Sequence, residues 1–421
     1  MDTLSGTISI NVYFVLALVA LLGDYAVRTT ADVLDLRGLW QGVPAPLQGL
    51  YSDDQYRASQ RYVCSATRIR MVERTVLLAV VCAFWFLGGF GWLDGLVCHA
   101  VSSTLGRGLL YLGIVTVSYL LLTVPFDAYR TFSLEASFGF NRTTPGIFVT
   151  DRLKELFLLV VIGGSLAAIV VSAFLWLGPG AWLLCLAVVV AFILLTQVLA
   201  PVVILPLFNR FKPLPEGELR EAVLSYTMSI GLPVEDVYVI DGSRRSSRAN
   251  AFFTGLGRHR RIVLYDTLIE GHSIDSLVTV LAHEAGHYGR GHILKGVLAA
   301  SLHAAILLYL LAFFLEQPGL FEAFGVSQSS VYVGFVLFGL LYTPVETALS
   351  VLFNMLSRRY EYEADRFAVE TTHNPSALAA ALRKLSVDNL SNPHPHRFQV
   401  LLNYSHPPLA ERLASIEGRS P

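Results

Sequence analysis

The sequence has few charged residues and no excess of either sign. Asp, Glu, Lys and Arg make up 15% of its 421 residues, and the formal net charge is −1. Nucleic-acid binding needs a basic surface, so we expect no nucleic-acid partner. Cysteine is also scarce, with four residues and no C-x-x-C pair, which excludes a disulfide-stapled scaffold. The first ten residues contain no Lys or Arg, so we expect no cleaved signal peptide.

Apolar residues, in contrast, are abundant. They make up 54% of the chain, which is too many for a soluble protein of this length. A bilayer span needs about 20 apolar residues, and seven stretches meet this requirement. They cover residues 9–27, 75–96, 107–125, 155–176, 180–206, 294–315 and 330–356. The sequence therefore predicts a mainly α-helical, multi-pass membrane protein in a lipid bilayer, with a break at Gly88 and Gly89 and a kink near Pro201.

Basic residues are concentrated in every second connection between these stretches. Arg and Lys gather in residues 28–74 and 126–154 and in the segments after residues 206 and 356, whereas 316–329 contains neither. Positively charged connections stay on the cytoplasmic side of a membrane. The pattern predicts an N-terminus outside the cell, and the long polar segments and the C-terminus in the cytoplasm.

The more polar segment 207–293 predicts a small α/β unit before the sixth span. The expected elements are an amphipathic helix at 216–230, strands at 236–241, 248–255 and 261–265 with Gly257 before the last, and a helix from Ile274. An edge strand of such a unit can take an extended peptide as an added strand. We therefore expect an N-terminal membrane domain at 1–206 and a second domain at 207–421 that contains the last two spans.

The helix expected from Ile274 carries His283-Glu284-Ala285-Gly286-His287, an H-E-x-x-H pattern. Helical residues four apart share one face, so His283 and His287 can present two imidazole nitrogens to one Zn²⁺. Glu284 lies beside that face, where it can accept a proton from a water molecule. The pattern is typical of zinc-dependent hydrolases, and the alternative is a chance match on an amphipathic helix.

A third ligand is expected just after the seventh span. A catalytic zinc site uses three protein ligands and one open position. Glu361 and Asp365 are four residues apart, and the last two spans bring them to the membrane face where the histidines lie. We predict Glu361 as the third ligand of one Zn²⁺ per chain, and Asp365 as the acceptor of a ligand histidine's second ring N–H. Glu363 is expected to point into solvent, and the alternative for the whole segment is a charged helix start on lipid headgroups.

Three other polar residues need an explanation. His292 lies about 140° around the helix from His287, so without a helix break it cannot share the ligand face and is expected beside the site or at the membrane interface. His303 and Glu346 each lie about 15 Å inside a predicted span, where an ionisable group is costly. We expect them to pair or to face a hydrated lumen; the alternative is that each bonds separately to a Ser or Thr.

Several further motifs accompany the H-E-x-x-H pattern. They are Ser357-Arg358-Arg359 before Glu361 and Asp365, Asn250-Ala251, Tyr404-Ser405-His406-Pro407-Pro408 with Glu411-Arg412, and the run from Pro125 to Asn141. With these residues the chain, over nearly its whole length, resembles the integral-membrane zinc metalloproteases of the CAAX prenyl protease 1 group, within the M48 peptidases. The resemblance implies a hollow barrel of seven helices around a water-filled chamber, capped by a zincin-like α/β metalloprotease domain.

The resemblance also implies roles for individual residues. Asn250 and Ala251 would bind the substrate backbone, and His406 and Arg412 would act as catalytic groups that stabilise the oxyanion. A preorganised His or Arg donor is well suited to that task. Taken alone, His406 before two prolines is typical of a loop and Arg412 of a solvated helix, so these two assignments depend on the resemblance.

The function expected is zinc-dependent peptide hydrolysis in the membrane. The family resembled removes the C-terminal tripeptide of prenylated proteins, so the expected partner is a peptide or protein substrate, and whether it is prenylated stays open. One alternative is a quality-control metalloprotease of the HtpX kind, although those usually have fewer spans. Another is a non-enzymatic scaffold with a vestigial zinc site. Because no di-lysine tail ends the sequence, we expect a homologue in a bacterial plasma membrane, with its active site on the cytoplasmic side.

Overall fold

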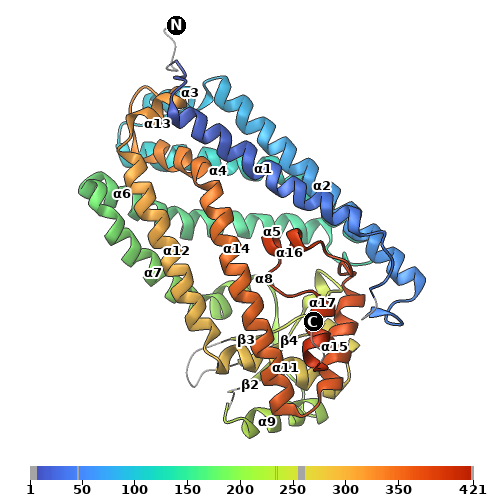
Figure 1. Cartoon of the computed structure of the whole chain (residues 1–421). Helices are drawn as coiled ribbons and strands as arrows, with labels where there is room; N and C mark the ends of the chain where they lie inside the picture. Colours follow the sequence, from blue (N-terminus) through green and yellow to red (C-terminus); the bar gives the residue numbers. More distant parts are fainter. Residues whose placement is uncertain (1–6, 45–46, 233, 235, 255–260, 419–421) are drawn as a thin grey trace.

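The computed structural model of the chain describes residues 7–44, 47–232, 234, 236–254 and 261–418. Long helices occupy one end of the molecule, and a small sheet with shorter helices occupies the other (Figure 1). The predicted fold class, a mainly helical membrane protein with an α/β unit, is confirmed at this level.

Four helices begin the described chain. They are α1 (Val12–Gly38), α2 (Asp53–Phe86), α3 (Gly89–Ala100) and α4 (Thr104–Tyr129). The Ser52 hydroxyl and the Gln55 side chain form a capping box that fixes the start of α2. The axes of α2 and α3 differ by 68°, and Gly88 between them has a φ of 73°, which glycine adopts without strain. The predicted break in the second span is therefore confirmed.

The connection expected at residues 28–74 is mostly helical, which corrects the sequence-based picture. Both α1 and α2 continue far beyond their apolar portions, and the polar half of α2 carries Arg70 and Arg74. Both arginines bind Asp32 of α1, at 2.8 and 2.9 Å, and only 1% of that carboxylate is exposed. The hydropathy pattern showed that these helical ends are charged. It did not show the ion pairs that hold them together.

The helical run Pro145–Phe208 folds back on itself. It contains α5 (Pro145–Leu158), α6 (Gly164–Leu177), α7 (Ala181–Leu199) and α8 (Leu205–Phe208), with π-helical turns at Leu159–Gly163 and Ala200–Ile204. Cys185 Sγ lies 4.0 Å from the carbonyl oxygen of Val170, whereas fifteen residues of straight helix would extend about 22 Å. The chain therefore reverses at Gly178–Gly180, and the second π-helical turn contains Pro201, where a kink was predicted.

The second half of the chain adds three helices to the membrane end. They are α12 (His292–Leu315), α13 (Pro318–Ala323) and α14 (Val331–Thr372). At 42 residues α14 is about 63 Å long, and in Figure 1 it runs from the membrane end to the helices beside the sheet. Within the described ranges, five helices are long and apolar enough to cross a membrane, or six if the bent α2–α3 pair is one span.

The apolar core at the membrane end is built from both halves of the sequence. Trp85 of α2 stacks on Phe324, which follows α13, with ring centroids 4.3 Å apart. Its indole N–H donates to the carbonyl oxygen of Ala323 at 2.8 Å, and Tyr332 of α14 is buried in the same cluster. Helices from the second half therefore complete the helical bundle of the first.

The sheet has four strands in the order β1-β2-β4-β3. They are β1 (Phe211–Pro213), β2 (Asp236–Ile240), β3 (Ala251–Thr254) and β4 (Arg261–Tyr265). Strands β2 and β4 are parallel, and the other two pairs are antiparallel. The three predicted strands are present, but the second starts at Ala251 and not at the predicted residue 248. Gly255 and Gly257 lie outside the described residues. The sequence did not predict β1, which ends in a proline and forms one edge of the sheet.

Six further helices complete the part of the chain that the structure describes. They are α9 (Glu218–Ser229), α10 (Asp266–Gly271), α11 (Ile274–Gly289), α15 (Pro375–Asp388), α16 (Arg397–Asn403) and α17 (Leu409–Ile416). Leu277 and Leu281 of α11 pack into the core of the sheet with Ile262 and Leu264 of β4. This packing fixes one face of α11 against the sheet.

Helix α11 also packs closely against α14, and Gly286 permits it. A Cβ atom at Gly286 would lie 3.0 Å from Ala364 Cα and 3.1 Å from its carbonyl oxygen. Those are backbone atoms that cannot rotate away. At Gly289 an added Cβ would be 3.7 Å from the ring of Phe367, an ordinary contact.

We expect Gly286→Ala to destabilise the folded protein by about 1–3 kcal/mol, because it overpacks the α11–α14 contact. Thermal unfolding in detergent measures the effect, and Gly289→Ala is the matched control on the same helix. Equal melting temperatures for the two variants would show that this contact tolerates a methyl group.

Candidate metal centre

Helix α11 presents the two histidines of the H-E-x-x-H pattern on one side. The helix starts at Ser273, whose hydroxyl accepts the N–H of Ser276, and its apolar face is held by the sheet. His283 and His287, one turn apart, have their Nε2 atoms 3.2 Å from each other. The predicted helix and the shared face of its histidines are both confirmed.

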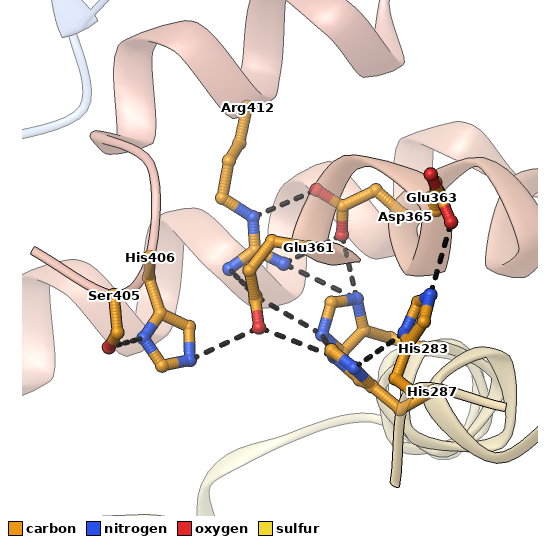
Figure 2. A network of polar contacts seen from close by, with 9 residues as sticks. His283, His287, Glu361, Glu363, Asp365, Ser405, His406 and Arg412 are labelled. Atoms are coloured by element: carbon orange, nitrogen blue, oxygen red, sulfur yellow. Dashed lines mark hydrogen bonds and ion pairs between the residues drawn. The ribbon is translucent and has the colours of Figure 1, made fainter. Parts of the chain in front are cut away.

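Helix α14 brings Glu361 to the same point (Figure 2). Its Oε2 lies 3.4 Å from His283 Nε2, and its Oε1 lies 3.3 Å from His287 Nε2. Ligands about 2.0–2.1 Å from a tetrahedral Zn²⁺ are about 3.3 Å from one another, so these separations fit. One ligand atom from each of the three residues lies within 4.8 Å of the others, and among the described residues no other His, Cys, Asp and Glu cluster meets that test.

The chemistry of these three groups also fits a cation. Two imidazole lone pairs and a carboxylate converge, and Glu361 Oε2 is buried without a hydrogen-bond partner. Burial acts to lower the pKa of His283, but Asp365 and Glu361 outweigh it and raise the pKa to about 9. The same negative field favours a metal ion in the position that the ring proton would take.

The second nitrogen of His283 is fixed by a carboxylate. Asp365 Oδ1 lies 2.8 Å from His283 Nδ1, and Arg412 of α17 donates two hydrogen bonds to Asp365, at 2.6 and 2.8 Å. The carboxylates of Asp365 and Glu361 raise the pKa of buried Arg412 in spite of desolvation, so it stays charged. The geometry predicted for Asp365 is therefore present, and Arg412 holds that carboxylate in place.

Glu284 lies beside the three convergent groups and lines a cavity of about 1510 Å³. Burial raises the pKa of its carboxyl group, while the neighbouring His283 and His287 act in the opposite direction. Other walls of the cavity come from α2, α15 and the segment around His406.

His406 approaches from the open side of the site. Its Nε2 lies 3.3 Å from Glu361 Oε1, its Nδ1 lies 2.9 Å from the Ser405 hydroxyl, and the side chain is 65% exposed. If Ser405 donates to Nδ1, His406 presents an Nε2–H toward the cavity.

Asn250 and Ala251 line the same cavity at the start of β3. The Asn250 side chain accepts the backbone N–H of Ala251 at 2.9 Å, and the Asn250 carbonyl accepts the N–H of Tyr265. Strand β3 is an edge of the sheet, so among the described strands it pairs on one side only, with β4.

Arg358 was assigned no chemical role from the sequence, yet it holds in place the segment that precedes His406. Its guanidinium donates to the carbonyl oxygens of Val400 and Tyr404, at 3.0 and 2.6 Å. These bonds tie α14 to the chain that leads directly to His406. Arg358 precedes Glu361 by about one helical turn, a spacing that places both on neighbouring parts of one helical face and could have identified it.

Two expectations about neighbouring residues are decided by the fold. Helix α11 ends at Gly289, Gly291 adopts a φ of 69°, and the break turns His292 back toward His287, with their Nδ1 atoms 3.1 Å apart. The expectation of solvated Glu363 was wrong: its carboxylate binds His292 at 3.1 Å and Arg359 at 3.0 Å, and only 31% of it is exposed.

His303 and Glu346 form the predicted pair. His303 Nε2 of α12 lies 2.8 Å from Glu346 Oε2 of α14. An ionisable group at this depth is stabilised by such a partner. Among the described residues, no hydrogen bond joins either side chain to a Ser or Thr, as the alternative would require.

Two family descriptions match the chain and together cover most of it. Residues 36–210 match "CAAX prenyl protease N-terminal, five membrane helices", and residues 213–420 match "Peptidase family M48". Over 402 residues the chain is 32% identical to the CAAX prenyl protease 1 homolog of Oryza sativa subsp. japonica, which covers 93% of this chain and 94% of that protein. The chain belongs to the CAAX prenyl protease 1 family.

Other members of this family are similarly close. CAAX prenyl protease 1 of Saccharomyces cerevisiae is 34% identical over 346 residues, with 76% of this chain and 74% of that protein covered. The crystal structure of S. mikatae Ste24p matches with a TM-score of 0.92 at 28% identity, covering 97% of this chain and 100% of that chain. The protein is thus a multi-pass membrane metalloendopeptidase of family M48, as its sequence motifs predicted.

Proposed function

We propose that this metalloendopeptidase uses one Zn²⁺ per chain, held by His283, His287 and Glu361. The supporting observation is the convergence of their three ligand atoms at separations that suit a tetrahedral ion. A zinc ion bound there would acidify a water molecule and polarise the scissile carbonyl group. Helices α11 and α14 hold the ligands on rigid elements.

The remaining chemistry belongs to the protein's own side chains. We propose that Glu284 accepts a proton from the attacking water and delivers it to the leaving amine as the peptide C–N bond breaks. His406, through its Nε2–H, and Arg412 are proposed to stabilise the negative charge on the former carbonyl oxygen. Two Arg412 nitrogens bind Asp365, and its Nη1 lies 3.6 Å from Glu361 Oε2, facing the site.

Substrate binding is proposed to use the open side of β3. There an extended peptide would pair with the backbone at Asn250 and Ala251, which places it along the cavity beside Glu284. The relatives are named CAAX prenyl proteases. We propose that the substrate is a prenylated protein or peptide, cleaved close to its C-terminus.

Cleavage of a farnesylated CAAX peptide tests this proposal against the same peptide without its prenyl group. We expect a kcat/KM at least about tenfold higher for the farnesylated peptide. Burying only two CH₂ groups of the prenyl chain contributes about 1.6 kcal/mol, which already corresponds to more than tenfold. Equal values would contradict a prenyl-binding role and would favour the quality-control alternative.

The membrane arrangement proposed is a hollow barrel of seven helices with a zincin-like cap. The bent α2–α3 pair and the reversal at Gly178–Gly180 support seven crossings, since the run Pro145–Phe208 then supplies two. The distribution of Arg and Lys supports an active site on the cytoplasmic side. We also propose that the chain has two domains, residues 1–206 and 207–421. Its location in a bacterial plasma membrane stays a prediction.

A further inference from the structure

The two sides of the His287 ring face different surroundings. Its Nε2 points to the metal centre, 3.3 Å from Glu361 Oε1, and its Nδ1 points away and lies 3.1 Å from His292 Nδ1. His283 has the same division, with Asp365 on its outer nitrogen. The two ligand histidines therefore have different outer partners, one a carboxylate and the other an imidazole.

One arrangement of protons satisfies every contact around His287. A ring that offers its Nε2 lone pair to a metal ion carries its proton on Nδ1, which then donates. His292 Nδ1 must accept that hydrogen bond, so the proton of His292 is on its Nε2. That atom lies 3.1 Å from Glu363 Oε2, which accepts in turn. The three residues form a chain of two hydrogen bonds that ends on a carboxylate.

The fold holds His292 firmly in this position. The left-handed Gly291 ends the helical path and turns His292 inward, and only 6% of the residue is exposed. Its ring stacks on Tyr360, with centroids 4.2 Å apart and planes inclined by 13°. Glu363 is held in turn by Arg359 at 3.0 Å and Lys295 at 3.9 Å.

We propose that His292 and Glu363 are positioning residues for His287, fixing its tautomer and orientation and strengthening it as a metal ligand. This inference rests on the proposed zinc function. The role corresponds to that of Asp365 for His283. Here, however, the imidazole of His292 lies between the ligand and the carboxylate, and the carboxylate of Glu363 lies among surface cations. Outer partners of this kind change metal affinity by about 10- to 100-fold.

Two substitutions of His292 separate positioning from packing. His292→Phe keeps a ring for stacking on Tyr360 but removes the acceptor, whereas His292→Asn keeps an acceptor close to the position of Nδ1. With full-length protein in detergent, the zinc Kd is measured by competition with a chelator, and the melting temperature of the zinc-free protein is recorded. We expect the Phe variant to raise the zinc Kd by about 10- to 100-fold, with most of the affinity recovered in the Asn variant.

Each outcome has a distinct meaning. A Phe variant with the unmodified zinc Kd, or an Asn variant as weak as the Phe variant, would overturn the positioning role. Unmodified protein that binds no zinc would instead refute the proposed function. The melting temperatures of the zinc-free variants show whether a change in zinc Kd comes from the site or from a loss of folding.

A double substitution tests whether Glu363 acts through His292. Glu363→Ala alone should weaken zinc binding by up to about tenfold, and adding it to His292→Phe should produce no further loss. Glu370→Ala is the matched control, since this carboxylate is on the same helix, is 56% exposed and contacts only Arg290, at 3.6 Å, among the described ion pairs. Additive losses in the double variant would show that Glu363 does not act through His292.

Discussion

Glu284→Gln is expected to lower kcat by about 10²- to 10⁴-fold while the protein keeps its fold and its zinc. The amide keeps the size of the carboxyl group but cannot accept a proton from water. Zinc should be retained because the proposed ligand atoms belong to His283, His287 and Glu361. Turnover of a CAAX peptide and zinc content, measured on the same preparation, check both parts of the prediction.

Glu270→Gln is the control for this experiment, because it makes the same chemical change at an exposed residue of α10. It should leave both turnover and zinc content unchanged. If the Glu284→Gln variant turned over at the normal rate, another group would have to be the base.

Glu361→Ala is expected to remove both zinc and activity. The substitution reduces three protein ligands to two, and a histidine pair alone does not complete a catalytic site. It also removes the negative charge that balances the ion in a buried setting, where the Glu361 side chain is 5% exposed. Zinc content after dialysis should fall from about one per chain toward zero, with peptide cleavage at background.

Glu370→Ala again provides the comparison, as a carboxylate on α14 outside the site. It should keep both zinc and activity. A Glu361→Ala variant that retained a full complement of zinc would contradict the ligand assignment and would point to another third ligand near His406.

The local elements of this protein could be predicted because they depend on residues close together in sequence. Apolar periodicity and length identified the long helices, and Gly88 marked the bend that follows α2. The four-residue spacing of His283 and His287, and of Glu361 and Asp365, placed each pair on one helical face. What hydropathy missed was the polar continuation of α1 and α2, since charged residues form helices as readily as apolar ones when ion pairs hold them.

The least predictable residues were those whose role depends on a partner far along the chain. Asp32 is buried by Arg70 and Arg74, and Arg358 holds backbone some 40 residues later in the sequence. No periodicity encodes such contacts. Glu363, which local geometry placed in solvent, is an example: the break at Gly291 brings His292 to it.

By itself the sequence determined the kind of chemistry: a histidine pair with a neighbouring carboxylate on one helix, in a chain built for the membrane. Only the tertiary structure decided that α14 crosses α11 closely enough, at Gly286, for Glu361 to reach that pair, and which groups hold each ring from behind. The physical reason is the separation in sequence over which each kind of interaction acts. Helical spacing is set by hydrogen bonds between residues four apart, whereas the meeting of two helices depends on how side chains from the whole molecule fit together.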